Sequence, residues 1–378
     1  MIENQTHGII HRQNTGAFRY HAWGTVARLT DGTLAAACSG GRIWHICPFG
    51  KSMLFLSRDE GRSWSAPIVV NDTWMDDRDV GLTALPNGGL LMSWFSADFS
   101  LLDERKKTLD EVYTEGEKRL VEGYREACLQ DAEEKPGSFL RVSLDGGLTW
   151  GETIRVDVSA PHGPVLLADG SLLYFAKKSE PKTERLICAM HSTDNGKTWT
   201  ELGHPPLPEH TAWSNFYEPH AVQLPSGRIA GAIRYEATPK NHFESYEQLT
   251  MFVTVSDDGG KSWSVPKCLG VSGSPPHLMY HSSGALVLSY GRREDGKENY
   301  DLSERALISW DEGETWTEDL AIFEDAPDWD LGYPSTVELS DGTLLTAFYQ
   351  KYRENGKTDK KGSFLFTKWH LVQGGNGE

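Results

Sequence analysis

The sequence predicts an all-β fold, a six-bladed β-propeller built as a single domain over residues 1–378. Two short motifs recur along the whole chain, and recurrence of this kind is typical of an architecture made of similar units. The composition agrees, because 13 Trp, 13 Tyr, 14 Phe and 38 Gly suit many short strands joined by tight turns. Closed all-β folds of this length often form one domain.

The first motif is S-x-D-x-G-x-[ST]-W, which occurs five times, at residues 57–64, 143–150, 192–199, 256–263 and 309–316. Its Asp carboxylate can accept backbone N–H bonds inside the turn, and its Gly permits a positive φ. Its Trp can pack the hairpin onto the rest of a sheet. These are structural tasks, so the motif predicts fold and not chemistry.

The second motif is an apolar strand that enters a turn of Asp, Asn or Ser followed by Gly and leaves as another apolar strand. Such a turn between apolar runs predicts a β-hairpin. The six turn residues are Asp31, Asn87, Asp169, Ser226, Ser283 and Asp341. Six hairpins predict six blades. The sixth hairpin has no S-x-D-x-G-x-[ST]-W motif after it, so we expect residues 363–371 to form a last strand and residues around 8–20 to close the ring against it.

Residues 101–136 interrupt this pattern within blade 2. The segment is rich in Glu, Lys and Arg, and its apolar residues recur at roughly helical spacing: Leu109, Val112, Tyr113, Leu120, Val121 and Tyr124. We expect a helical insertion that covers the flank of the propeller. A lid over a site, or a contact through which copies of the chain form an oligomer, is the alternative.

The charge of the chain limits its partners. The net charge is −17 at pH 7, which opposes binding to nucleic acid or to an anionic membrane. Residues 1–6 lack the basic and apolar stretches of a signal peptide, so we expect a cytoplasmic protein. An anionic small ligand would need arginines placed close to its site.

Counting residues back from each hairpin turn locates a candidate site, because the innermost strands of a propeller begin at one mouth of the central channel. The residues eight positions before each turn are Trp23, Asp79, Pro161, Glu218, Pro275 and Tyr333. Beside them stand His21, Arg78, His162, His220 and His277. This concentration of polar side chains at equivalent places predicts a polar funnel.

Together these motifs resemble the sialidase superfamily of propellers, in which the first motif is known as the Asp-box. Sialidases carry a nucleophilic tyrosine in the last blade, a glutamate that polarises it, and three arginines that bind the substrate carboxylate. The resemblance implies Tyr333 as the nucleophile, Glu218 as its base and Arg234 as one arginine of the clamp, each at the family's distance from its turn. A tyrosine suits this chemistry because a phenol is neutral until a base takes its proton.

The chain also departs from the sialidase pattern, and it resembles a divergent branch of sialidase-like proteins. Ala22 stands where the family has its first arginine, and the loop 41–51 contains no acid where the family has its general acid. His45 and Asp79 are the two candidates to replace that acid. The third arginine is Arg292, Arg293 or Arg305, and the sequence leaves this choice open.

Three functions follow as hypotheses. The first is a sialidase-like exo-glycoside hydrolase on a terminal acidic sugar, which needs no cofactor. The second is a hydrolase or lyase on a uronic-acid-containing oligosaccharide, in which the funnel histidines act as acid and base. The third is a carbohydrate-binding propeller without catalysis. No metal is expected in the first, although His21, His45, His162, His220 and His277 would offer imidazole ligands if they converged.

Overall fold

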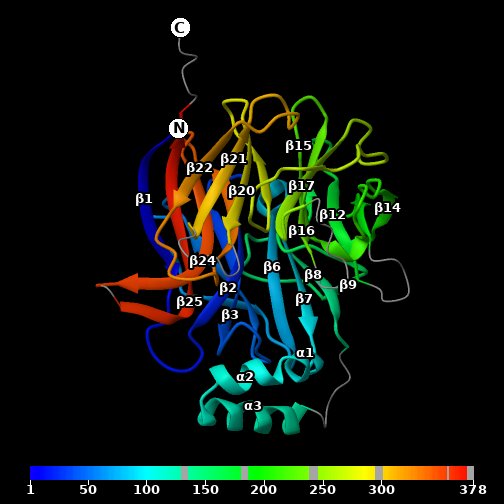
Figure 1. Cartoon of the computed structure of the whole chain (residues 1–378). Coiled ribbons are helices and arrows are strands. Elements are labelled where there is room, and N and C mark those ends of the chain that lie inside the picture. The colour runs from blue at the N-terminus through cyan, green and yellow to red at the C-terminus, as the bar shows by residue number, and fades with distance from the viewer. Residues whose placement is uncertain (129–134, 180–185, 238–245, 294–300, 356, 373–378) are drawn as a thin grey trace.

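The predicted six-bladed propeller is confirmed. The computed structural model describes residues 1–128, 135–179, 186–237, 246–293, 301–355 and 357–372. Within these residues the chain forms six antiparallel sheets, one for each predicted hairpin (Figure 1). Sheet neighbours follow each other along the chain, as expected for blades that are built one after another.

The first three blades come from the N-terminal half. Blade 1 contains β2 (Tyr20–Arg28), β3 (Leu34–Arg42), β4 (Lys51–Ser57) and β5 (Ile68–Asn71). Blade 2 contains β6 (Asp76–Ala84), β7 (Leu90–Ala97), β8 (Gly137–Ser143) and β9 (Ile154–Val156). Blade 3 contains β10 (Val158–Ser159), β11 (Val165–Leu166), β12 (Leu172–Lys178), β13 (Ile187–Ser192) and β14 (Thr200–Gly203).

The other three blades complete the ring. Blade 4 contains β15 (Phe216–Gln223), β16 (Ile229–Glu236), β17 (Leu249–Ser256) and β18 (Lys267–Cys268). Blade 5 contains β19 (His277–Tyr280), β20 (Leu286–Arg292), β21 (Ser303–Ser309) and β22 (Glu318–Phe323). Blade 6 contains β23 (Gly332–Glu338), β24 (Leu344–Glu354), β25 (Lys357–Leu371) and, at its outer edge, β1 (Ile2–His11).

The ring is closed by the two ends of the chain. Strand β1 pairs antiparallel with β25, with Ile9 opposite Leu365, so blade 6 draws strands from both termini. The predicted partner of the last strand, residues around 8–20, therefore overlaps β1 only in part. Residues 12–19 instead lead from β1 into β2.

The Asp-boxes make the turns predicted for them. In the third box, one carboxylate oxygen of Asp194 accepts the backbone N–H of Thr198 at 2.9 Å and the hydroxyl of Ser192 at 2.8 Å. The Trp199 indole donates to the carbonyl of Gly196 at 2.9 Å. In antiparallel blades these boxes and the hairpin turns lie at one end of the strands, so the opposite end is free for the funnel.

The apolar core lies between neighbouring blades. Buried Leu54 of blade 1 packs with Leu82, Leu90 and Met92 of blade 2 in one such layer. Similar layers between the other blades join the sheets into one ring. Because each blade is sealed against two others, the innermost strands are held at fixed positions around the channel.

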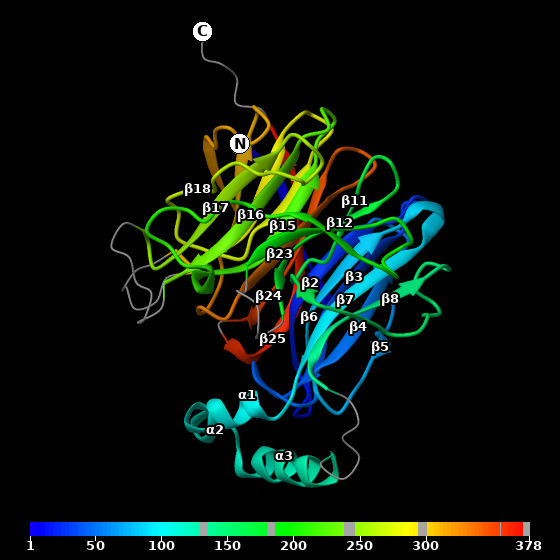
Figure 2. The ribbon, with the colours of Figure 1, turned by 90° about the vertical axis from the view of Figure 1, so that its right-hand side faces the viewer.

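The helical insertion in blade 2 is also confirmed. Helices α1 (Ser100–Glu104), α2 (Lys106–Val112) and α3 (Glu115–Cys128) stand between β7 and β8. Figures 1 and 2 show them together at one end of the molecule, outside the sheets, where they pack against the loop between β3 and β4. The expected position on the flank of the propeller is therefore wrong. Residues 129–134 of the predicted insertion lie outside the described residues. No helix in the described part of the chain is long and apolar enough to span a membrane.

Candidate functional site

Four blades place a side chain into the same mouth of the channel by the same backbone distortion. Trp23, Asp79, Glu218 and Tyr333, the equivalent residues found from the hairpins, all have φ between 47° and 52°. The pairing register of each innermost strand shifts at this point. A positive φ is uncommon for residues other than Gly and costs free energy, and such strain concentrates at functional sites. The repeated bulge brings the four side chains to equivalent positions at one mouth of the channel.

The other two blades carry proline at the equivalent place and begin differently. Proline fixes φ near −65°, so Pro161 and Pro275 cannot adopt the bulge. The inner strand of blade 3 is broken into β10 and β11 around Pro161, and β19 of blade 5 begins only at His277. The mouth is therefore polar on the side of blades 2, 4 and 6.

Tyr333 and Glu218 form the central pair of this mouth. The phenol of Tyr333 donates to Oε1 of Glu218 at 2.5 Å, although the two residues are 115 positions apart in sequence. Burial raises the pKa of Tyr333 well above its ordinary value, and the negative charges of Glu218 and Asp79 raise it further. The resting phenol is therefore neutral and has a carboxylate ready to take its proton.

Two arginines lie beside this pair. Nη1 of Arg234 donates to Oε2 of Glu218 at 2.6 Å, and its Nη2 donates to Glu236 at 2.7 Å. The guanidinium carbon of Arg293 lies 5.6 Å from the centre of the Tyr333 ring. Arg293 fits there because Gly332 has no side chain: a Cβ at that position would lie 2.8 Å from Nη2 of Arg293.

These arginines fix the charge of Glu218. Burial alone would raise the pKa of Glu218, but the charge of Arg234, the hydrogen bonds from Tyr333 and Arg234, and the charge of Arg293 together hold the pKa below its ordinary value. Glu218 is therefore ionised. Arg234 is shared between Glu218 and Glu236, and Arg293 places a second guanidinium group beside the phenol.

Asp79 is the second carboxyl group of the mouth, and its environment differs. Burial raises the pKa of Asp79 to about 7, and the negative charge of Glu218 contributes to this shift. At neutral pH Asp79 is thus divided between the acid and the carboxylate. Two carboxyl groups held in different protonation states can serve as an acid and a base at the same pH.

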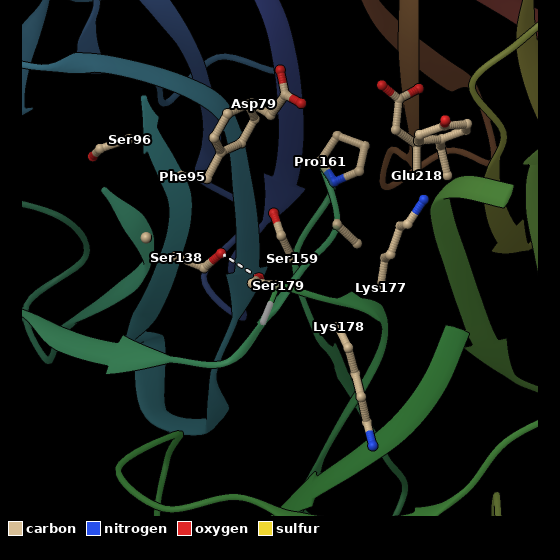
Figure 3. Close-up of a pocket in the computed structure, with 13 residues that line it drawn as sticks. Asp79, Phe95, Ser96, Ser138, Ser159, Pro161, Lys177, Lys178, Ser179 and Glu218 are labelled. Atoms are coloured by element: carbon tan, nitrogen blue, oxygen red, sulfur yellow. Dashed lines mark hydrogen bonds between the residues drawn. The ribbon is translucent and has the colours of Figure 1, made fainter. Parts of the chain in front are cut away.

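Asp79 and Glu218 border a pocket of about 360 Å³ that runs outward between blades 2, 3 and 4. In Figure 3 these two residues lie at one side of the pocket and Lys178 at the other, with Ser138, Ser159 and Ser179 between them. Hydroxyl, ammonium and carboxyl groups line it together with Phe95 and Tyr217. Its volume lies in the range of small-molecule sites, and this lining suits a sugar ring with its substituents.

Blade 1 contributes an aromatic ring to the mouth. Trp23 is buried, and the guanidinium groups of Arg78 and Arg42 lie over its indole at 4.1 Å and 4.6 Å from a ring centre. Both arginines donate to the buried carboxylate of Asp76. These contacts hold Trp23 and Arg78 in place at the border with blade 2.

His45 lies on the far side of Trp23, in the loop between β3 and β4. Its ring meets the edge of Trp23 at 4.8 Å between ring centres, and its Nδ1 lies 3.3 Å from Asp330 Oδ1. The same carboxylate oxygen accepts the hydroxyl groups of Tyr20 at 2.8 Å and Tyr349 at 3.1 Å. A histidine and a carboxylate thus face each other at the rim of the mouth.

A family model described as a BNR repeat-like domain matches residues 5–273, more than half of the chain. The chain belongs to the BNR repeat-like family. A search of curated proteins by sequence found no match.

Solved structures share the fold of this BNR repeat-like chain at low sequence identity. A protein of unknown function from Dyadobacter fermentans DSM 18053 is 17% identical, with a TM-score of 0.72 over 97% of this chain and 98% of that one. The Trypanosoma rangeli sialidase in complex with the inhibitor DANA is 12% identical, with a TM-score of 0.64 over 97% of this chain and 60% of that one. The intramolecular trans-sialidase from Ruminococcus gnavus is 14% identical, with a TM-score of 0.64 over 95% and 96%. These likenesses establish a common fold.

The BNR repeat-like fold separates the predicted arginines. Arg293 lies against Tyr333, whereas Arg292 and Arg305 both bind Asp319 and Asp301 on blade 5. Of the three candidates for the last arginine, Arg293 is therefore the one beside the pair of Tyr333 and Glu218.

Three of the predicted histidines lie deep in the channel and link blades. His162, His220 and His277 are buried, with ring centres 4.4 to 5.6 Å apart. Nδ1 of His220 accepts the backbone N–H of Leu278, and Nδ1 of His277 accepts that of Thr336. Burial lowers the pKa of all three, so the rings are neutral at physiological pH.

The other histidines do not join this group. His21 is buried and packs edge-on against His11 at 4.6 Å between ring centres. Within the described residues, no group of three or more His, Cys, Asp or Glu side chains is placed to hold a metal ion. The alternative of a metal site built from the five histidines therefore finds no support in this part of the chain.

Arg42, Asp76, Glu236 and Asp330 are site residues that the sequence reasoning did not single out. Asp330 stands three residues before Tyr333, at the end of blade 6 that carries the mouth, and this position was the available signal. Arg42 and Asp76 are buried beneath Trp23, and no motif marks them. These residues make contacts between different blades, and such contacts cannot be deduced from the sequence of a single hairpin.

Proposed function

We propose that this chain is a sialidase-like exo-glycoside hydrolase that removes a terminal acidic sugar, with Tyr333 as nucleophile. The observation that carries the proposal is the 2.5 Å hydrogen bond from the Tyr333 phenol to the ionised carboxylate of Glu218. A phenol with a raised pKa becomes a nucleophile only when a base removes its proton during attack. Arg234 and Arg293 supply the charge that would bind the substrate carboxylate.

In the first step, Tyr333 Oη forms a bond to the anomeric carbon while its proton passes to Glu218. The glycosidic bond breaks, and its electron pair leaves with the aglycone oxygen. Asp79 in its acid form donates a proton to that oxygen, so the leaving group departs as a neutral alcohol.

In the second step, water attacks the anomeric carbon of the glycosyl-tyrosine. Asp79, now a carboxylate, takes the proton of this water. Glu218 returns its proton to the phenolate as the bond to Tyr333 breaks, which restores the resting enzyme. The substrate is hydrolysed in two displacements, so the configuration of the anomeric carbon is retained.

The test is release of a fluorophore from aryl glycosides that include an aryl sialoside and aryl uronides. We expect Tyr333→Phe and Glu218→Gln to lower kcat by at least about a hundredfold. Tyr280→Phe is the matched control, because Tyr280 ends β19 at the opposite end of the channel. Cleavage of a uronide that persists in Tyr333→Phe would contradict the proposal and favour the uronide hydrolase or lyase. Sugar binding without any turnover would favour a binding protein.

A further inference from the structure

A second pocket lies on the other face of blade 2. Successive side chains of a strand point to opposite faces of its sheet. Phe95 and Ser138, which are paired across β7 and β8, line the pocket beside the mouth, whereas the neighbouring pair of Trp94 and Phe139 lines the second pocket. We call this second cavity the outer pocket. Its volume of about 330 Å³ is in the range of small-molecule sites.

Two arginines of the outer pocket are held by neutral groups. Nε of Arg141 donates to the hydroxyl of Thr153 at 2.9 Å, and its Nη1 donates to the carbonyl of Val70 at 2.5 Å. The second of these bonds joins β8 to β5 of blade 1, and Figure 2 shows the two strands side by side. Nη2 of Arg155 donates to the carbonyl of Pro136 at 2.9 Å. Neither arginine forms an ion pair with another described residue, so both keep their full positive charge.

An aromatic wall supports these two guanidinium groups. The guanidinium carbon of Arg141 lies 5.9 Å from the centre of the Trp94 ring, and that of Arg155 lies 5.6 Å from the centre of the Phe139 ring. The two rings stack at 5.8 Å between centres. The indole N–H of Trp94 is buried and has no hydrogen-bond partner in the described part of the chain. Buried donors are normally satisfied, so this wall lacks an acceptor.

The acidic groups near the outer pocket are already engaged. Asp72 is the carboxylate of the lining, and it forms an ion pair with Lys51. The buried carboxyl group of Asp77 lies behind the lining, where hydroxyl and amide groups of the pocket wall donate to it. Burial raises the pKa of Asp77 to about 7, so this group is only partly ionised at neutral pH. Because Lys135 adds a third cation to the lining, positive charge exceeds negative charge in the pocket.

We propose that the outer pocket binds a small molecule through a carboxylate or phosphate group, which Arg141 and Arg155 hold. A guanidinium group presents paired N–H donors that match two oxygens of such an anion. The chain as a whole has a net charge of −17 and repels anions at long range, so binding depends on this local group of cations. The site is independent of the proposed hydrolase, because it lies on the face of blade 2 opposite the pocket bordered by Asp79 and Glu218.

The test follows the indole N–H of Trp94 by NMR, with ¹⁵N-labelled tryptophan in the full chain. Trp94→Phe identifies the signal as the one that disappears. Inorganic phosphate and glucuronate are added separately, with sodium chloride keeping the ionic strength constant. We expect a saturable shift of the Trp94 signal with phosphate for a phosphate-bearing ligand, or with glucuronate for a carboxylate-bearing ligand. No saturable shift with either anion would overturn the proposal.

A pair of arginine variants tests the residues of the outer pocket. Arg155→Met should raise the anion concentration at half saturation about tenfold or more, while the bond from Arg141 to Val70 stays in place. Arg62→Met is the matched control, because Arg62 is exposed in the first Asp-box and should leave half saturation unchanged. Equal weakening in the two variants would mean that the anion responds only to net charge, and an unchanged midpoint in Arg155→Met would equally overturn the proposal.

A further variant separates the outer pocket from the mouth. Tyr333→Phe removes the proposed nucleophile but should keep the wild-type half saturation of the Trp94 signal. This result would hold even if wild type cleaved no aryl glycoside, so the anion site and the proposed hydrolase can fail separately. A tenfold weakening in Tyr333→Phe would show that the signal reports binding in the mouth, and the separate site would be rejected.

Discussion

Asp79 and Glu218 occupy equivalent positions on blades 2 and 4, yet their surroundings separate their protonation states. Glu218 has two arginines and a phenol that stabilise its charge. For Asp79, burial and the charge of Glu218 outweigh the more distant arginines. In the proposed mechanism, this difference assigns the role of acid to Asp79 and the role of base to Glu218.

This assignment predicts the pH dependence of catalysis. Because the pKa of Asp79 is about 7, its acid form is lost as pH rises through 7, and kcat/KM should fall about tenfold per pH unit above that value. Asp79→Asn should lower kcat/KM about a hundredfold or more and abolish this alkaline limb. The measurement is kcat/KM between pH 5 and 9 with the aryl glycoside that the chain cleaves. An alkaline limb that is unchanged in Asp79→Asn would remove Asp79 from the mechanism.

Arg292 and Arg293 are adjacent in sequence, so their variants form a matched pair that tests the proposed binding of the substrate carboxylate. Arg293 lies over Tyr333, while Arg292 binds Asp319 at 3.1 Å. We expect Arg293→Met to lower kcat/KM for the acidic sugar about tenfold to a hundredfold, the range for a lost hydrogen bond to a charged group. Arg292→Met should leave kcat/KM near the wild-type value. Similar losses in the two variants would show that Arg293 acts only through the stability of blade 5.

At the level of strands, the hairpins and Asp-boxes were predictable because their turn chemistry is local. Asp, Gly and Trp at fixed spacing specify a turn wherever they occur. The equivalent positions before each hairpin were also predictable by counting from the turn. The shared bulge at Trp23, Asp79, Glu218 and Tyr333 was not, because positive φ is rare for these residue types.

For the histidines of the innermost strands, the sequence likewise predicted the positions but not the contacts. Their spacing predicted that they share a mouth, but their hydrogen bonds run from blade to blade, as from His220 to Leu278. Which partner each ring finds depends on the packing of strands distant in sequence. The funnel was therefore predicted as a set of positions, while the contacts that each member makes required the structure.

These buried rings predict a loss of stability in mild acid. Burial lowers the pKa of His220 to about 3, so the folded chain keeps the ring neutral while the unfolded chain takes up a proton below about pH 6.5. Protonation therefore favours the unfolded chain, and one such ring costs about 2 kcal/mol between pH 6.5 and pH 5.

His220→Gln should make the free energy of unfolding fall less steeply over this range, since Gln keeps an acceptor but does not titrate. Urea unfolding at pH 7, 6 and 5 measures the effect. His204→Gln, at a partly exposed position after β14, should keep the wild-type slope. Parallel slopes in wild type and His220→Gln would contradict the role given to burial.

At the scale of the whole molecule, β1 joins the first residues of the chain to the last blade and helps to close the six sheets into one ring. Ile10 of β1 is 5% exposed and packs with Phe364 and Phe366 of blade 6 and with Val26 and Phe55 of blade 1. This layer seals the border between the first and last blades. The mouth depends on it, since Trp23 and Tyr333 approach from the two sides of that border.

Substitutions at two neighbouring residues of β1 test how this strand closes the ring. Ile10→Ala removes buried methyl groups from the seal and should lower the free energy of unfolding by about 2–4 kcal/mol. Ile9→Ala changes the adjacent side chain, which is 40% exposed, and should stay within about 0.5 kcal/mol of wild type. Urea denaturation followed by tryptophan fluorescence measures both. If blade 6 opened independently of the ring, Ile10→Ala would show two separate transitions; a single transition at lower urea indicates that the six blades unfold as one unit.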